Sequence, residues 1–197
     1  MRYIIITLFF FNTLLASPTD EIKINFNTIT KDILNIVKDK TRKVNIREKE
    51  VIDIITPIFD FKSMARLSLG KLWKTLDKST QTKFIDIYTK KTKQSYSSKL
   101  NNYSNERIVI NYAKQLKPNR IILNTTLISS TDNMEVIYKY YKTKKKISNK
   151  NRWLIYDVII NNRSQVKSDK KQHYDYLKEH NILELIDSLK NKLNIDA

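Results

Sequence analysis

The sequence predicts an α+β domain in which helices come first, an antiparallel sheet follows, and two more helices close the chain. Two observations carry this prediction. Apolar residues recur with a period close to 3.6 up to Asn101-Asn102 and with a period close to 2 from Arg107 onward. The links between the predicted strands are only a few residues long, which favours antiparallel pairing between neighbours. No internal repeat or long linker divides the chain, so we expect a single domain over residues 17–197.

The first two helices are predicted from their apolar faces. A cap at Thr19 or Asp20 precedes apolar residues at spacings of three and four, which share one face: Ile22, Phe26, Ile29, Ile33 and Val37. A second helix is predicted at 47–58, and Pro57 limits it because proline cannot donate a helical hydrogen bond.

Two further helices are predicted from their start and stop signals. Asp60 is a candidate cap for a short third helix, and Gly70 stands where a left-handed helix stop is expected. A long fourth helix begins at Asp77 or Ser79. It carries Phe84 and Tyr88 on its apolar face.

The second half of the chain alternates as strands do. We predict four strands at 107–112, 120–129, 134–142 and 152–160. Both faces of the second and fourth strands are partly apolar, so we expect the sheet to be covered on much of both sides. The closing helices are predicted at 164–178 and 182–193.

The N-terminus has the pattern of a secretory signal peptide. Arg2 precedes an apolar stretch at 4–15, and the small residues Ala16 and Ser17 follow it. The stretch is shorter than the roughly 20 residues that span a bilayer. We therefore predict a signal peptide at 1–16 and a soluble, exported mature chain; the alternative is a short apolar first helix. Export from a bacterial cytoplasm would place the protein in the periplasm.

The composition excludes several classes of site. The 197 residues include no Cys and one Gly, which excludes disulfides, cysteine-ligated metals, thiol nucleophiles and glycine-rich phosphate loops. The formal net charge is +17, and loss of the predicted signal peptide removes only the charge of Arg2. Such a balance is typical of proteins that bind nucleic acid or an anionic membrane, and also of chains that are simply rich in Lys.

No catalytic or metal-binding set assembles from the sequence. Asp157 lies in an apolar strand, where a carboxylate could act as a base. The alternative is an acceptor of structural hydrogen bonds that caps nearby backbone. Residues 136–156 hold no acid but seven basic residues, which form either a solvated hairpin tip or an electrostatic guide toward anionic lipid or an acidic partner: Lys139, Lys142, Lys144, Lys145, Lys146, Lys150 and Arg152.

Three segments resemble the MlaC family, also called the toluene-tolerance family. The segment 59–73 matches every fixed position of the family signature, namely Phe59, Asp60, Phe61, Met64, Ala65, Leu69, Gly70 and Trp73. The segment 153–159 resembles a second family block, with Trp153, Tyr156 and Asp157 in place. The residues 177–189 resemble the closing helices of the family, so the resemblance covers nearly the whole mature chain.

The resemblance implies a helical layer packed on an antiparallel sheet of four to five strands, of the cystatin-like or nuclear-transport-factor-like type, with an apolar pocket between the layers. It also implies a periplasmic phospholipid carrier that maintains outer-membrane lipid asymmetry without chemistry or cofactor. The implied partners are phospholipid, the substrate-binding subunit of an inner-membrane ABC transporter, and an outer-membrane lipoprotein–porin complex. The carrier would be a monomer and would bind no nucleic acid.

We expect the pocket to be lined from both layers. The helices would contribute Phe61, Met64, Leu67, Leu69, Phe84 and Tyr88, and the sheet Val136, Tyr138, Tyr140, Tyr156, Val158 and Ile160. Arg163 departs from the family pattern, which has an apolar residue there, and is a candidate for the lipid phosphate. Two other hypotheses for the function are not excluded by the sequence. One is an enzyme on the same type of sheet with Asp157 as its base, and the other is an exported basic protein that binds polyanions.

Overall fold

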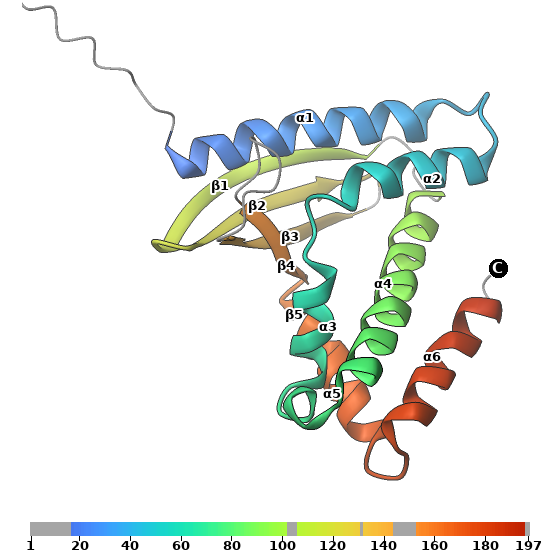
Figure 1. Ribbon diagram of the computed structural model, residues 1–197. Coiled ribbons are helices and arrows are strands. Elements are labelled where there is room, and N and C mark those ends of the chain that lie inside the picture. Colours follow the sequence, from blue (N-terminus) through green and yellow to red (C-terminus); the bar gives the residue numbers. More distant parts are fainter. Residues whose placement is uncertain (1–16, 102–105, 131, 144–152, 196–197) are drawn as a thin grey trace, which may run out of the picture.

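The computed structural model describes residues 17–101, 106–130, 132–143 and 153–195. Six α-helices and a five-stranded sheet make up this part of the chain (Figure 1), which confirms the predicted α+β class. The helices are α1 (Pro18–Lys38), α2 (Val44–Ile55), α3 (Phe61–Leu69), α4 (Lys78–Asn101), α5 (Gln165–Tyr176) and α6 (Ile182–Ile195). A short 3₁₀ helix, η1 (Leu72–Thr75), precedes α4. The predicted signal peptide lies outside the described residues.

The sheet is an antiparallel meander of β1 (Arg107–Lys117), β2 (Arg120–Ile128), β3 (Asn133–Lys142), β4 (Trp153–Ile160) and β5 (Arg163–Ser164), in that order. The short segment before α3 also pairs with β4. The backbone N–H of Ile155 donates to the carbonyl of Ile58, and that of Asp60 donates to the carbonyl of Ile155, both at 2.8 Å. These bonds join the helical part of the chain to the sheet.

Helix ends follow capping chemistry, with one correction. Ser17, not Thr19 or Asp20, caps α1, because its Oγ accepts from the backbone N–H of Asp20 at 3.2 Å and Pro18 opens the helix. Asp60 caps α3 through the N–H of Ser63, as predicted. Gly70 ends α3 with φ 59°, which glycine adopts without steric cost.

The apolar side chains form three clusters. One lies between α1 and the sheet, a second joins α3, α4, α5 and α6, and a third packs α1 on α2. In Figure 1, α1 crosses one face of the sheet, while α3 to α6 form a separate bundle on the side of β4 and β5. The bundle does not reach β1, whose outward residues Val109, Tyr112 and Leu116 are exposed. The helices therefore cover β1 on the face that packs on α1, but they leave its outward face exposed.

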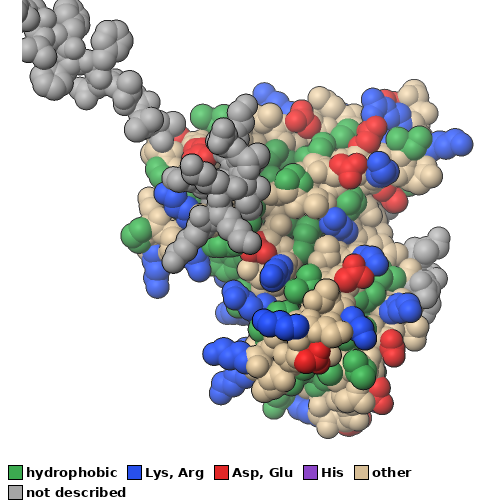
Figure 2. All heavy atoms as spheres, in the orientation of Figure 1, with side chains coloured by type: hydrophobic (Ala, Val, Ile, Leu, Met, Phe, Trp, Pro, Cys, Tyr) green, Lys and Arg blue, Asp and Glu red, His purple; other side chains and the backbone are tan. Residues whose placement is uncertain are grey.

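Lys and Arg side chains are spread over the helices as well as over the sheet (Figure 2). Within the described residues, no helix combines the length and the apolar character that crossing a bilayer requires.

Candidate functional site

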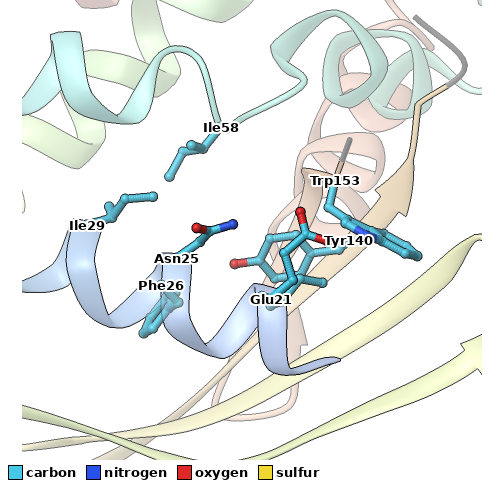
Figure 3. Close-up of a pocket in the computed structure, with 8 residues that line it drawn as sticks. Glu21, Asn25, Phe26, Ile29, Ile58, Tyr140 and Trp153 are labelled. Atoms are coloured by element: carbon cyan, nitrogen blue, oxygen red, sulfur yellow. The ribbon is translucent and has the colours of Figure 1, made fainter. Parts of the chain in front are cut away.

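A pocket lies between α1 and the adjoining ends of β3 and β4 (Figure 3). One face of α1 forms its first wall, with Glu21, Ile22, Asn25, Phe26 and Ile29. These residues follow the spacing of three and four that places side chains on one side of a helix. The opposite wall consists of Ile58, Tyr140 and Trp153.

The pocket is apolar inside and polar at one side. Figure 3 shows the side chains of Glu21, Asn25 and Tyr140 directed toward one another, while Ile29 and Ile58 close the other side. Burial raises the pKa of the Tyr140 phenol well above its usual range, so this hydroxyl stays neutral at physiological pH. The cavity volume is about 30 Å³, which is room for only a water molecule or two.

The apolar layer under α1 continues from the pocket across the sheet. Phe26 packs on Tyr138, with 4.9 Å between the ring centroids. Burial raises the pKa of Tyr138 to about 12. The structure brings five of the sheet residues that the sequence singles out into this one cluster with α1: Val136, Tyr138, Tyr140, Val158 and Ile160. Tyr156 is not among them, because its ring contacts Tyr141 and the guanidinium of Arg120 instead.

The helical residues that the sequence singles out occupy a different place. Phe61, Met64, Leu69, Phe84 and Tyr88 lie together in the core of the α3–α6 bundle. Met64 and Phe84 are fully buried there, whereas Leu67 is 39% exposed on α3. The structure therefore does not bring these six residues to the pocket under α1.

Arg163 also lies away from this pocket. It is in β5 and pairs with Ile160, at the opposite end of β4 from Trp153. Seven residue steps of β-strand separate the two ends of β4, which is about 23 Å.

Sequence reasoning missed the wall that α1 contributes. The periodicity of Ile22, Phe26 and Ile29 marks the inward face of α1, but periodicity cannot tell a face that lines a pocket from one that fills a core. Trp153 belongs to a family block in the sequence, but the residues of this strand that we predict for the pocket are Tyr156, Val158 and Ile160.

Asp157 has the contacts of a structural carboxylate. It is buried and accepts hydrogen bonds from the Ser164 hydroxyl at 2.8 Å and from the backbone N–H of Val166 at 3.2 Å. Lys139 Nζ lies 3.1 Å from Oδ2 of Asp157, the oxygen that also accepts from Ser164 at 2.8 Å. These bonds tie β4 to the first turn of α5 and to β3, as the structural alternative for this residue predicts.

The described residues offer no cluster of three or more His, Asp or Glu side chains that could hold a metal ion. Two tyrosine hydroxyls, of the buried Tyr88 and the partly buried Tyr96, make hydrogen bonds within the bundle. The Tyr88 hydroxyl donates to Asp169 at 2.6 Å, and the Tyr96 hydroxyl donates to Gln165 at 2.7 Å. Both bonds join α4 to α5.

Comparisons with known proteins agree on one family. The family model described as MlaC protein matches residues 27–191. The intermembrane phospholipid transport system binding protein MlaC of Haemophilus influenzae is 30% identical over 92 residues, which is 46% of this chain and 42% of that protein. The match thus spans less than half of the curated relative.

A solved structure has the same fold. The phospholipid-binding protein from Ralstonia solanacearum, in complex with a phospholipid, superposes with a TM-score of 0.74. The superposition covers 92% of this chain and 99% of that one, at 16% sequence identity.

Proposed function

Because the chain belongs to the MlaC family, we propose that its mature form is a periplasmic carrier that moves phospholipid between the outer and inner membranes. The observation that carries this proposal is the apolar layer between α1 and the sheet, which opens at the pocket. Transfer of an acyl chain through water costs about 0.8 kcal/mol per CH₂. A carrier must therefore offer apolar walls to the tails throughout the transfer.

The pocket must widen to hold a tail, because its present volume suits only a water molecule or two. Part of α1 packs on β1 and β2, and apolar side chains such as Ile22 and Phe26 form the contact. These contacts are non-directional, so α1 can separate from the sheet without breaking a strand pairing. The acyl tails would then occupy the space between the sheet and the α1 side chains that had packed on it. Water would stay excluded from the apolar layer.

The headgroup would stay at the side of the pocket where the polar groups lie. Lys142 Nζ lies 5.9 Å from the centre of the ring of Trp153, which lines the pocket. A Lys there can pair with a phosphate. We therefore favour Lys142 for this role in place of Arg163, which lies at the other end of β4.

Family membership extends the proposal to partners. The carrier would receive and deliver lipid at an outer-membrane lipoprotein–porin complex and at the substrate-binding subunit of an inner-membrane ABC transporter. It would act as a monomer, without cofactor or catalysis. The contacts of Asp157 argue only against its use as a catalytic base, because its oxygens are engaged by Lys139, Ser164 and the α5 backbone.

Two α1 variants test the proposal. Protein beginning at Ser17 contains every described element, and extraction followed by mass spectrometry measures the phospholipid that co-purifies with it. We expect about one phospholipid per chain. Ile29→Glu places a charge in the pocket wall and should abolish co-purification, because burying an unpaired carboxylate beside acyl chains is costly.

Ile24→Glu is the matched control on the same helix. Ile24 is 60% exposed, so the same change there should leave the lipid content unaltered. Equal loss in both variants, or retention in both, would contradict the assignment of the pocket. An empty wild-type protein that binds DNA with a steep salt dependence would favour a polyanion-binding function instead.

A further inference from the structure

At one end of the sheet the charged residues of β1, β2 and β3 are all basic. Between residues 107 and 156 the sequence has two acids, Asp132 and Glu135, and both lie toward the turn between β2 and β3. The other end, where β1 turns into β2 and β3 ends, presents four basic residues: Lys114, Lys117, Arg120 and Lys142. Figure 2 shows Lys and Arg side chains gathered on the side of the molecule where Figure 1 places the β1–β2 turn.

Exposed apolar residues lie among these charges. Leu116 is 53% exposed and Tyr112 is 47% exposed, and Lys114 lies between them along β1. Among the residues that the structure describes, β1 is the edge strand of the sheet, and one of its sides has no neighbouring strand. We call the group Lys114, Leu116, Lys117, Arg120 and Lys142 the basic end of the sheet.

Two contacts of Lys142 connect the basic end to the pocket. The backbone N–H of Lys142 donates to the carbonyl of Asn119 in the β1–β2 turn at 3.2 Å. The ammonium group of Lys142 in turn lies over Trp153, which lines the pocket. The guanidinium of Arg120 lies 5.4 Å and 5.3 Å from the ring centres of Tyr141 and Tyr156, so it is held in place beside the turn.

We propose that the basic end of the sheet docks the protein on an anionic phospholipid surface, with the pocket beside the bilayer. The inference rests on the proposed carrier function, and it adds a direct membrane contact to it. Lys and Arg near a membrane surface are attracted to anionic headgroups, and an exposed Leu among them can enter the headgroup layer. An acidic protein surface would use the charges but would gain little from the exposed Leu116.

Vesicle co-sedimentation tests the docking. The protein beginning at Ser17 is used, because the apolar residues 4–15 would bind a bilayer on their own. It should sediment with vesicles of phosphatidylcholine and phosphatidylglycerol in equal parts, and not with phosphatidylcholine alone. The binding should weaken as salt is added, since salt screens exposed charges.

Three variants separate the contributions of the basic residues and of Leu116 to vesicle binding. Lys114→Gln/Lys117→Gln should bind the anionic vesicles about 25-fold more weakly, from a factor of about five for each basic residue. The control Lys74→Gln/Lys83→Gln removes two exposed Lys from the helical part of the molecule and should bind like the wild type. Leu116→Ser should weaken binding several-fold without any change in charge.

The outcomes distinguish this proposal from the carrier function. A wild-type protein that carries phospholipid but ignores anionic vesicles would overturn the docking alone, whereas a wild-type protein without lipid would overturn the carrier function. Equal effects of the two Lys pairs would also contradict the docking. Full competition by soluble polyglutamate, together with no effect of Leu116→Ser, would assign the surface to an acidic protein. The Lys114→Gln/Lys117→Gln variant should keep its co-purified phospholipid.

Discussion

At the scale of single residues, His173 couples the stability of the bundle to pH. It is buried, with its ring edge-on to Phe84 and Tyr88 at 5.6 Å and 6.2 Å between centroids. Burial and the charge of Lys91 lower the pKa of His173 to about 4, although a hydrogen bond with the Ser68 backbone acts in the opposite direction. An unfolded His titrates near pH 6.5. The unfolded chain therefore binds a proton that the folded chain does not.

His173 makes the folded protein less stable at acidic pH. Because the folded pKa lies below the unfolded one, the stability that His173 contributes is present above about pH 6.5 and is lost as the pH falls toward 4. The loss amounts to about 3 kcal/mol when complete. We expect His173→Phe to abolish this part of the pH dependence, measured as the denaturant midpoint across that range.

Asp169 acts in the opposite direction, because burial raises its pKa and the folded state then gains stability on acidification. Asp169 is present in both the wild type and His173→Phe. The difference between their pH profiles of stability therefore reports the contribution of His173 alone. Parallel pH profiles for the two proteins would rule out the role given to His173.

At the scale of the elements, capping residues explain which boundaries the sequence predicts. Asp60 marks the start of α3 and Asp77 that of α4, where its Oδ1 accepts from the Thr80 N–H at 3.0 Å. The start of α2 was predicted three residues late, since Lys43 at its N-cap makes no side-chain capping bond. The predicted end of β1 at residue 112 was five residues early. A bulge after Ile110 breaks the alternation of apolar and polar residues, and the strand ends at the exposed Lys117, which gives no apolar signal in the sequence.

The pairing of faces is what the sequence could not predict. The apolar face of α1 and the inward residues of β3 and β4 are recognisable separately. Nothing in their periods says that α1, rather than α3 or α4, covers this part of the sheet. Phe84 and Met64 lie on apolar helix faces with the same spacing as the face that carries Phe26. They nevertheless pack within the bundle, whereas Phe26 packs on the sheet.

Asp157 joins three elements, and its removal should loosen all of them. Asp157→Asn leaves the partly buried Lys139 without its counter-charge and weakens the cap on α5. We expect a loss of about 2–3 kcal/mol in the free energy of unfolding, below the usual cost of breaking a fully buried pair because Lys139 reaches solvent. Denaturant unfolding measures it.

Asp86→Asn is the matched control. Asp86 forms an exposed pair with Lys90 within one helix at 2.8 Å, and such pairs contribute about 0.5 kcal/mol or less. Asp157→Asn should also retain bound phospholipid, since the carboxylate is structural. A destabilisation no greater than that of Asp86→Asn would show that the bonds of Asp157 contribute little.

At the scale of the whole molecule, two of the three apolar clusters differ in structure. The α3–α6 bundle is a filled core, with Met64, Ala65 and Phe84 fully buried. The layer between α1 and the sheet is the part with a pocket, and it meets the surface beside the basic end of the sheet. In the proposed mechanism α1 separates from the sheet while the bundle stays packed on β4, so lipid enters without unfolding of the domain. In the proposed docking, part of the net charge of +17, which alone is also compatible with nucleic acid, faces anionic membranes.

The central claim is that phospholipid tails lie between α1 and the sheet, and photolabelling tests it most directly. A phospholipid with a photoreactive group near the end of one acyl chain is loaded, irradiated and mapped by peptide mass spectrometry. We expect adducts in the α1 peptide that contains Phe26 and Ile29, and in the peptides of Tyr140 and Trp153. Adducts confined to the bundle, at residues such as Met64 and Phe84, would contradict the claim and place the tails among the helices.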